Sequence, residues 1–407
     1  MNVIGVVGEF NPFHHGHALL LKRARAALGA DTPAVAVLSG DFVQRGGPAV
    51  FNKQARAAAA VAAGFDLVTE LPLPWCTLSA EYFARGAVAV LDSLGVVTHL
   101  VFGSECGDIE PLERLAAVCS EAETLRRIRD AMAEGHSFAV ARQRVLAERL
   151  GPQAQLLSRP NNILAVEYLR ALAARGSGMR PMTVFREGAA HDAAASADSM
   201  RCASELRALL LEYKDIAPFV PAAAHAVYGR ELALGRGPVG ESSLESAALS
   251  RLRTLSEAEF LALPDAGEGL GTRLYRAVRS QPTLADILRA AGTKRYPTAR
   301  LRRMLVCGCL GIRRDDIPSA PPYIRVLALS PRGQLLLRRA RGRAELPILN
   351  RPASVRRLDG GALRVFEQTA LARDFYALGY AAPGERAPGS DWRSVPLVMG
   401  KDFAIDG

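Results

Sequence analysis

The sequence lacks the features of a membrane protein and of a disulfide-stabilised secreted protein. No run of eighteen or more apolar residues occurs among its 407 residues, and a transmembrane helix requires such a run. The first residues form a strand-like segment without the charged and apolar pattern of a signal peptide. The six cysteines are scattered and match neither a disulfide framework nor a zinc motif. We therefore expect a cytoplasmic protein with reduced thiols that does not contact a membrane.

The positive charge of the chain is concentrated in one segment. The net charge is +10, and residues 294–345 contain 13 Lys or Arg against 3 Asp or Glu. The positive charge of this segment, +10, therefore equals the net charge of the whole chain. A clustered basic patch is typical of a protein with a polyanionic partner. A solvated surface in an arginine-rich protein gives the same count, so the patch indicates RNA only beside a domain that activates nucleotides.

The most informative segment is the turn at residues 8–17. The apolar residues 3–7 before it predict a buried parallel strand, and residues 18–28 after it predict a helix with an apolar stripe. In an open α/β sheet such a turn lies at the carboxyl end of a strand, where ligands bind. The free N–H groups of the helix start favour anions, and Gly16 would let a phosphate approach the backbone.

Two histidines frame this glycine, and several interpretations of them are open. His14 and His17 could donate hydrogen bonds to the oxygens of a nucleoside triphosphate while its α-phosphate is attacked. Either could instead be a helix cap or a surface residue, and Asn-Pro is a common turn signal. A metal site is a third alternative, but no cluster of carboxylates or cysteines completes a ligand set. Two histidines at the first strand-to-helix turn favour phosphate binding.

The first half of the chain alternates strand-like and helix-like segments, which predicts a doubly wound parallel sheet covered on both faces. Further strands are expected at 34–38, 66–71, 98–102 and 182–185, and helices at 54–63, 79–94, 110–150 and 162–174. Beyond about residue 205 the pattern is helical, at 205–213, 243–254, 269–280 and 283–291. Residues 326–329 and 334–337 predict a hairpin, and the final twenty-five residues an irregular tail.

This pattern divides the chain into three expected regions. Residues 1–205 form the α/β domain, 206–320 a mainly helical and basic region, and 321–407 a small C-terminal region that packs on the rest. The loops that follow the predicted strands carry nearly all the unusual polar residues. Because the carboxyl ends of parallel strands meet at one edge of a sheet, we expect these loops to converge on one site.

Two of these loops contain candidate site residues. The polar loop 39–48 is typical of a substrate wall, although an exposed glycine loop is the alternative. Asp41 could orient a nucleophile or a lysine, and Lys53 at the start of the next helix could stabilise developing phosphate charge. Gly103 would let an adenine or a ribose lie against the backbone, or it simply forms a tight turn.

Two further candidates lie near the end of the α/β region. Asn162 is at a predicted helix start, where asparagine is first of all an N-cap. Arg186 follows the strand at 182–185, and its guanidinium fork suits a triphosphate.

The turn also carries a family resemblance. Its His-x-Gly-His sequence resembles the signature of the nucleotidylyltransferase superfamily, which has a Rossmann-like doubly wound fold. The longer form, Gly-Glu-Phe-Asn-Pro-Phe-His-x-Gly-His, resembles the tRNA(Met) cytidine acetate ligases. Further matches are Gly-Asp-Phe-Val-Gln-Arg-Gly at 40–46 and Phe-Gly-Ser-Glu at 102–105. These matches make that branch of the superfamily the expected one.

The resemblance implies an ATP-dependent ligase with a defined set of site residues. It would activate acetate as acetyl-adenylate and transfer the acetyl group to the N4 amine of the wobble cytidine of elongator tRNA(Met). The expected catalytic residues are His14, His17, Asp41 and Lys53. The expected ATP contacts are Val7, Gly8, Glu9, Phe10, Asn11, Pro12, Phe13, His14, His15, Gly16, His17, Ala18, Leu19, Leu20, Gly103, Asn162 and Arg186. Mg²⁺ is expected from the triphosphate chemistry, although no residue identifies a ligand for it.

Two weaker elements complete the resemblance. Ser204 and Arg207 are possible contacts to the β and γ phosphates, but they are only three residues apart, and Cys202 stands where a small hydroxyl residue is common. The basic segment resembles the family's RNA-binding element, and its expected tRNA contacts are Lys294, Arg295, Tyr296, Arg300, Arg302 and Arg303. The cations would neutralise phosphates, and the tyrosine could stack on an unpaired base. The expected partners are tRNA and acetate, with no stable protein partner.

Two other functions remain open. An adenylyltransferase for a small phosphorylated cofactor precursor would explain the first half of the chain and leave the basic second half without a role. A non-catalytic RNA-binding protein on the same fold would not need an intact turn. The presence together of His14, Gly16, His17, Lys53 and Arg186 counts against it.

Overall fold

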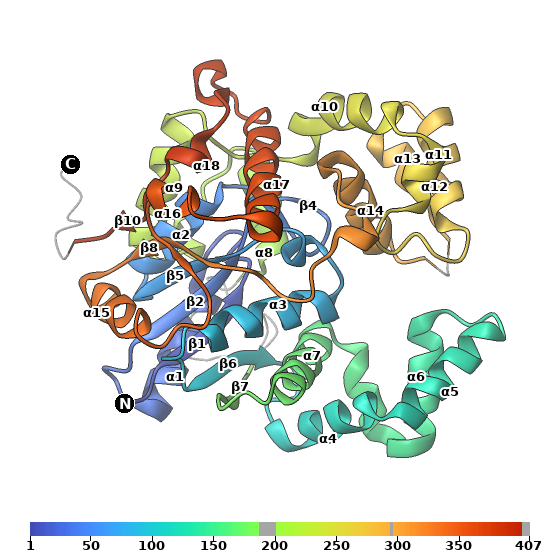
Figure 1. Cartoon of the computed structure of the whole chain (residues 1–407), viewed down its shortest axis with the longest axis horizontal. Coiled ribbons are helices and arrows are strands. Elements are labelled where there is room, and N and C mark those ends of the chain that lie inside the picture. The colour runs from blue at the N-terminus through green and yellow to red at the C-terminus, as the bar shows by residue number, and fades with distance from the viewer. Residues whose placement is uncertain (187–200, 294–295, 401–407) are drawn as a thin grey trace.

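A mainly parallel sheet forms the centre of the computed structural model, which describes residues 1–186, 201–293 and 296–400. Its strand order is β10-β8-β5-β2-β1-β6-β7, with β9 paired to β8 (Figure 1). The strands are β1 (Ile4–Gly8), β2 (Ala34–Ser39), β5 (Leu67–Leu71), β6 (His99–Ser104), β7 (Arg180–Phe185), β8 (Ile324–Leu329), β9 (Ile348–Leu349) and β10 (Leu397–Val398). The predicted strands of the first half are thus confirmed, with shifts of one or two residues.

Helices cover both faces of this sheet, so the doubly wound fold is confirmed. The helices packed on it include α1 (His15–Leu28), α2 (Lys53–Ala62), α3 (Ala80–Ser93) and α7 (Pro160–Arg175), and α9 (Ala222–Ala233) packs on α2. The alternation along β2 shows why: Val35 and Val37 pack in the cluster of α3 and α7, whereas Ala34, Ala36 and Leu38 pack in the cluster of α1 and α2. A strand buried on both faces needs the continuous apolar run that the sequence provides.

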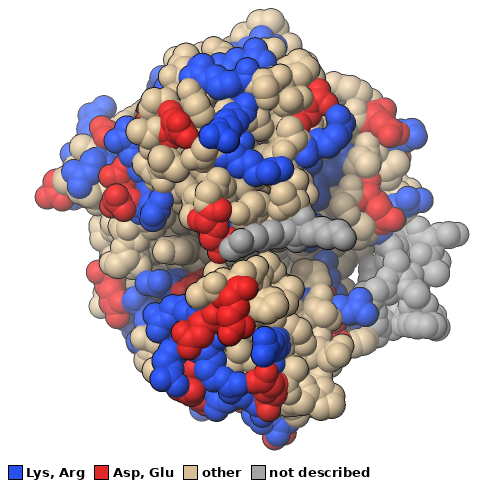
Figure 2. Space-filling model, turned by 90° about the vertical axis from the view of Figure 1, so that its right-hand side faces the viewer, with Lys and Arg blue, Asp and Glu red and all other residues tan. Residues whose placement is uncertain are grey.

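Two helical lobes project from one side of the sheet (Figure 1). One contains α4 (Ile109–Ser120), α5 (Ala122–Ala133) and α6 (Phe138–Leu150). The other contains α10 (Glu241–Thr254), α11 (Glu257–Leu261), α12 (Leu270–Ser280), α13 (Leu284–Ala291) and α14 (Thr298–Leu310). Figure 2 looks at this side and shows basic and acidic side chains intermingled on both lobes. No helix in the described part of the chain is long and apolar enough to cross a membrane.

The C-terminal region adds strands to the sheet, and here one sequence prediction is wrong. Residues 326–337 do not form a hairpin, because β8 is followed by helix α15 (Pro331–Ala340). Ser330 caps this helix by accepting a hydrogen bond from Gly333 N at 3.1 Å, and Pro331 occupies its first turn. Serine followed by proline is a helix-start signal, and it outweighs the strand-like run of leucines that follows.

The final residues are more ordered than the expected irregular tail. They include the short helix α18 (Ser390–Arg393) and β10, which pairs in parallel with the outer edge of β8. Strand β8 itself pairs antiparallel to β5, with Arg325 opposite Glu70. The segment after residue 320 therefore completes the sheet that the first half begins. The division of the chain at about residues 205 and 320 stays a prediction.

Candidate functional site

The turn between β1 and α1 is held in place by buried contacts to the rest of the molecule. Asn11 Oδ1 accepts a hydrogen bond from Val50 N at 2.9 Å, and Phe13 N donates to the hydroxyl of Tyr228 at 2.8 Å. The rings of Phe10 and Phe13 are buried with centroids 5.0 Å apart. These side chains anchor the turn in the core. Within the predicted ATP-binding segment, they therefore hold the backbone of the turn in place.

The two histidines of the turn lie against each other at the start of α1. Their ring centroids are 4.0 Å apart. His14 Nδ1 accepts a hydrogen bond from Gly16 N at 3.0 Å, and His17 Nδ1 accepts one from His14 N at 3.2 Å. His14 is therefore the N-cap of α1. A Cβ atom at Gly16 would lie 2.8 Å from His14 Cε1, so glycine is needed here to make room for the ring.

This geometry fixes where each imidazole carries its proton. Because both Nδ1 atoms accept backbone hydrogen bonds, a neutral ring must be protonated on Nε2. Burial, helped by the positive charge of Arg186, lowers the pKa of His14 to about 3. Burial, His14 and Arg186 lower the pKa of His17 well below its usual value. Both rings are thus neutral donors at pH 7.

One of these donors is unused. His14 Nε2 is buried and has no hydrogen-bond partner among the described residues. A buried donor without an acceptor costs on the order of 1–3 kcal/mol. A phosphate oxygen placed over the start of α1 would satisfy it, and would also face the free N–H groups of the helix. The predicted hydrogen-bonding role of the histidines therefore fits the structure.

Two arginines approach the turn from other elements. Arg207, in α8 (Ala203–Leu211), donates to the backbone oxygen of Asn11 at 3.0 Å. Arg186 follows β7 and donates to Asn161 Oδ1 at 3.2 Å. Ser204 lies at the exposed start of α8, with its hydroxyl 2.9 Å from the sulfur of Cys202. The structure thus brings Arg186 and Arg207 to the histidines.

The half-buried carboxylate of Glu9 lies next to these cations. Burial raises the pKa of Glu9, although Arg45 and Arg207 oppose the shift. Its Oε1 accepts a hydrogen bond from Gln44 N at 3.0 Å. This bond ties the first turn to the polar loop 41–48, which contains the short strands β3 (Phe42–Val43) and β4 (Gly47–Pro48). Both loops therefore lie at the same edge of the sheet, as predicted.

Asn162 is not an N-cap, because α7 begins earlier than expected and Arg159 precedes its first residue. Asn162 is 1% exposed, and both ends of its amide are used internally. Its Oδ1 accepts from Cys106 N, and its Nδ2 donates to Leu156 O, each at 3.0 Å.

Glu105 supplies the capping carboxylate of α7 by accepting from Asn162 N at 2.9 Å. Gly103 lies nearby in β6, and a Cβ atom there would meet nothing closer than 3.8 Å. The end of β6 is therefore braced by α7 and still has room against its backbone at this glycine.

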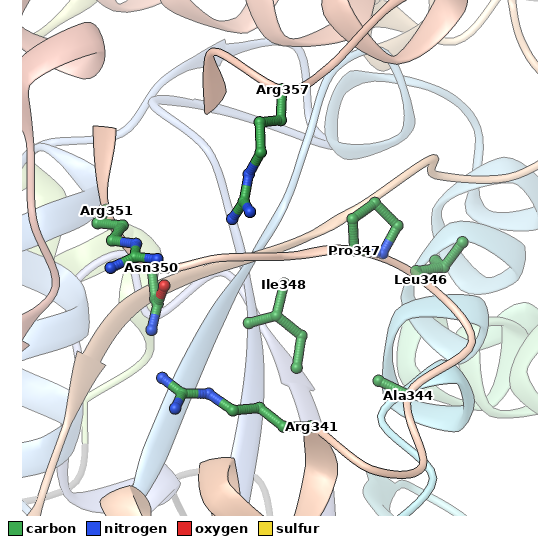
Figure 3. A pocket seen from close by; sticks show the side chains of 8 residues that line it. All are labelled: Arg341, Ala344, Leu346, Pro347, Ile348, Asn350, Arg351 and Arg357. Atoms are coloured by element: carbon green, nitrogen blue, oxygen red, sulfur yellow. The ribbon is translucent and has the colours of Figure 1, made fainter. Parts of the chain in front are cut away.

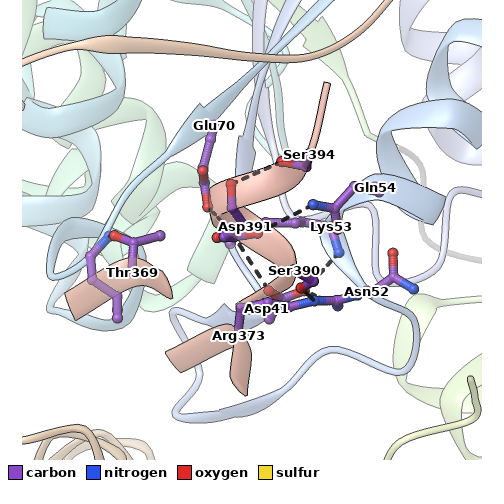
Figure 4. A network of polar contacts seen from close by, with 12 residues as sticks. Asp41, Asn52, Lys53, Gln54, Glu70, Thr369, Arg373, Ser390, Asp391 and Ser394 are labelled. Atoms are coloured by element: carbon purple, nitrogen blue, oxygen red, sulfur yellow. Dashed lines mark hydrogen bonds and ion pairs between the residues drawn. The ribbon is translucent and has the colours of Figure 1, made fainter. Parts of the chain in front are cut away.

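Lys53 lies in a buried cluster of charges (Figure 4). Its side chain is fully buried, and its Nζ is 2.7 Å from Glu70 Oε1 and 2.5 Å from Asp391 Oδ2. Asp41 accepts a hydrogen bond from the backbone nitrogen of Lys53 at 2.8 Å. The structure therefore joins the two predicted catalytic residues to each other, with the ammonium group directed at carboxylates of β5 and α18.

Two arginines complete this ion cluster. Arg325 Nη1 is 2.7 Å from Asp391 and 3.1 Å from Glu70, and Arg373 Nη1 is 3.3 Å from Asp41. Burial would raise the pKa of Asp391, but Arg325 and Lys53 hold it well below its usual value. Sequence reasoning missed Arg325, Arg373 and Asp391. No local pattern marks them, and Asp391 is 338 residues from Lys53.

The predicted RNA-binding arginines of α14 make internal contacts. Arg303 pairs with Asp265 at 3.1 Å, and Arg302 pairs with Glu241 at 2.6 Å. Arg300 donates to the backbone oxygen of Asp265 at 2.8 Å. These contacts hold α14 against α10 and the segment before α12.

The remaining members of the predicted RNA-binding set add little to this picture. The hydroxyl of Tyr296 donates to Glu268 O at 2.7 Å. Lys294 and Arg295 lie outside the described residues.

At Gly46 a Cβ atom would lie 2.4 Å from Arg303 N, so the loop 41–48 packs directly on the backbone of α14.

The first turn of this parallel sheet presents two neutral imidazole donors at a helix start, beside two arginines. This is the arrangement of a nucleotidyltransferase. A family model described as HIGH Nucleotidyl Transferase matches residues 1–389. The tRNA(Met) cytidine acetate ligase of Syntrophomonas wolfei is 34% identical over 98% of this chain and 99% of its own length. That of Syntrophotalea carbinolica is 38% identical over 86% of this chain and 84% of its own. The chain belongs to the tRNA(Met) cytidine acetate ligase family.

Solved structures agree with this assignment. The crystal structure of Thermotoga maritima TmcAL bound with alpha-thio ATP has a TM-score of 0.92 and 31% sequence identity, and the match covers 98% of this chain and 100% of that one. The apo form of the same protein has a TM-score of 0.90. The predicted family and fold are confirmed.

The lowered pKa of His14 predicts how stability depends on pH. Below pH 6.5 the unfolded chain protonates this histidine, whereas the folded protein keeps it neutral down to about pH 3. The free energy of unfolding must therefore decrease as the pH is lowered through this window, by up to about 1.4 kcal/mol per pH unit. His14→Asn keeps a capping side chain without titrating, so urea unfolding between pH 4.5 and 6.5 should show a flatter dependence. Equal slopes for the variant and the wild type would contradict the assignment, and His15→Asn is the matched control.

The ion cluster predicts strong coupling between Asp391 and Lys53. Asp391→Asn leaves buried positive charge in excess, and breaking a buried ion pair typically costs about 3–5 kcal/mol. Lys53→Met in the same chain restores the charge balance, so the double variant should be more stable than the sum of the single changes allows. A double-mutant cycle of unfolding free energies measures this coupling. Strictly additive effects would show that the two side chains do not interact.

Proposed function

We propose that this protein is an ATP-dependent ligase that acetylates the N4 amine of the wobble cytidine of elongator tRNA(Met). Acetate is first activated as acetyl-adenylate. The observation that carries the proposal is the buried, unpartnered Nε2 of His14 at the start of α1, beside His17. Arg186 is close enough for its positive charge to lower the pKa of His14. This is a site for a phosphate group under attack, in a chain that belongs to the acetate ligase family.

The reaction needs activation because free acetate has no leaving group that an amine could displace. In the first step an oxygen of acetate forms a bond to the α-phosphorus of ATP, and the bond to the pyrophosphate oxygen breaks. In the second step the N4 amine attacks the acyl carbon, the bond to the adenylate oxygen breaks, and AMP leaves. The amine loses one proton. Both steps are balanced by acetate, ATP and the cytidine alone.

The site residues divide between contact and support. His14 and His17 donate from Nε2 to phosphate oxygens, where charge grows as pyrophosphate leaves, and preorganised donors of this kind stabilise the transition state. Arg186 and Arg207 bind the triphosphate from the other side. Gly103 leaves space for the nucleoside against β6. Asn162 acts as a positioning residue, because its amide bonds to Cys106 just after β6 and to Leu156 in the segment before α7.

Asp41 and Lys53 also act as positioning residues. Their buried contacts fix the base of the loop 41–48, and this loop in turn contacts Glu9 and α14. The described residues contain no group of three or more His, Cys, Asp or Glu able to hold a metal ion. Mg²⁺ would enter with the triphosphate, whose phosphate oxygens supply ligands for it. The proposed setting is the cytoplasm, with tRNA and acetate as the partners.

The order of steps predicts where isotope goes. With acetate labelled by oxygen-18 in both positions, one labelled oxygen should appear in AMP for each acetylcytidine formed, because that oxygen bonds to phosphorus before the acyl group leaves. Mass spectrometry of AMP and of the tRNA nucleosides measures both products. Unlabelled AMP would rule out acetyl-adenylate. Acetylation from acetyl-coenzyme A without ATP would rule out the activation step, and nucleotidyl transfer to a small acceptor without acetate would favour an adenylyltransferase.

His17→Ala tests the first step separately from RNA binding. Removal of one preorganised donor typically lowers a rate by about a hundredfold to a thousandfold. Exchange of labelled pyrophosphate into ATP, in the presence of acetate and the absence of RNA, should fall by this factor, with tRNA affinity unchanged. His136→Ala removes a histidine between α5 and α6, away from the turn, and serves as the control. Exchange at the wild-type rate in His17→Ala would remove the turn from the chemistry.

A further inference from the structure

A cavity of about 470 Å³ lies beside β9, away from the turn that carries the histidines. Three arginines line it: Arg341 at the end of α15, Arg351 just before α16 (Pro352–Val355), and Arg357 just after α16. Figure 3 shows Arg357 directed into the cavity from one side, Arg341 from the opposite side, and Arg351 next to the amide of Asn350. Three guanidinium groups and one amide therefore face a single space.

These cations differ from the arginines of α14. Arg302 and Arg303 are paired with Glu241 and Asp265. By contrast, none of the ion pairs formed within residues 1–186, 201–293 and 296–400 involves an arginine of the cavity. All three cavity arginines are exposed. The arginines of the C-terminal half thus form two groups: those of α14 are used for internal packing, and those of the cavity are accessible to a ligand.

The chemistry of the cavity selects an oxyanion. Three like charges around one space repel each other, and an anion between them removes that repulsion. The planar fork of arginine matches the oxygens of a phosphate, which it binds through two parallel hydrogen bonds. The amide of Asn350 adds a neutral donor from the same wall. A phosphate group accepts hydrogen bonds from side chains of both kinds.

The position of the cavity indicates the source of the phosphate. Strand β9 pairs with β8, and β8 is separated from β1 by β5 and β2. From β9 to β1 there are four strand spacings, which amount to roughly 19 Å. The cavity therefore lies beyond the reach of the triphosphate bound at the turn, but a polynucleotide that places one base at the turn extends over this distance.

We propose that this arginine cavity binds one backbone phosphate of the tRNA substrate. The inference rests on the proposed function, and it identifies a contact outside α14. Asn350 and Arg351 also line a small cavity together with Arg325 and Asp391 of the ion cluster. The bound phosphate would thus lie directly behind the charges that fix Asp41 and Lys53.

The test compares two triple variants that lose the same charge. The cavity variant carries Arg341→Ala, Arg351→Ala and Arg357→Ala. The control carries Arg338→Ala, Arg356→Ala and Arg364→Ala. These exposed arginines lie in α15, just after α16 and in α17 (Gly360–Ala377), outside the cavity lining. Affinity for tRNA(Met) transcript is measured across a salt series. Loss of one phosphate contact should reduce the magnitude of the log-log slope by about 0.7 to 0.9 in the cavity variant and leave the control unchanged.

Two further measurements separate the possible failures. Acetate-dependent pyrophosphate exchange without RNA should be the same in both variants and in the wild type, and equal melting temperatures check the fold. A wild-type slope in the cavity variant, or an equal loss in the control, overturns the inference while the proposed function stands. Saturable binding of inorganic phosphate that the cavity variant loses, with its tRNA slope unchanged, assigns the cavity to a free anion and also overturns it. Absence of tRNA binding by the wild type overturns both proposals.

Discussion

The buried ion cluster around Lys53 is the constraint on which the rest of the structure depends. Six charges without access to water are tolerated only if each has an opposite partner in good geometry. Its members come from the loop after β2, from α2, β5, β8, α17 and α18: Asp41, Lys53, Glu70, Arg325, Arg373 and Asp391. Because no single region supplies balanced charge, the C-terminal strands and helices must close onto the first sheet.

This closure also organises the site. Asp41 fixes the first turn of α2 and the base of the loop 41–48. The same loop binds Glu9 through Gln44 and packs on α14 at Gly46. One short segment therefore touches the ion cluster, the turn that carries the histidines and the helix of the basic lobe. A displacement of the ion cluster, the turn or α14 would shift the other two through this loop, because the contacts involve backbone atoms, which cannot rotate away as side chains can.

The parts that could be predicted from the sequence are those whose physical cause is local. The strands follow from apolar runs, and the placement of His14 and His17 at a helix start follows from a turn of ten residues. The hairpin after β8 was predicted wrongly because a capping serine and a proline start a helix within the apolar run. The partners of Lys53 were not predicted, since they lie far along the chain. The charge count of α14 indicated a basic surface, but a count does not show that Arg303 already faces Asp265.

The place of Asp391 in this cluster has a consequence for the order in which the protein is made. During synthesis Lys53 leaves the ribosome 338 residues before Asp391, and domains fold as their segments emerge. Until α18 docks, Lys53 and Arg325 lack the carboxylate that they share. The nascent chain would hold an uncompensated positive charge inside its sheet. Docking of α18 supplies the carboxylate that neutralises this charge and so stabilises the closed fold. A chain broken off before that point would be left unstable and open to proteolysis, and it would not persist as a half-active enzyme.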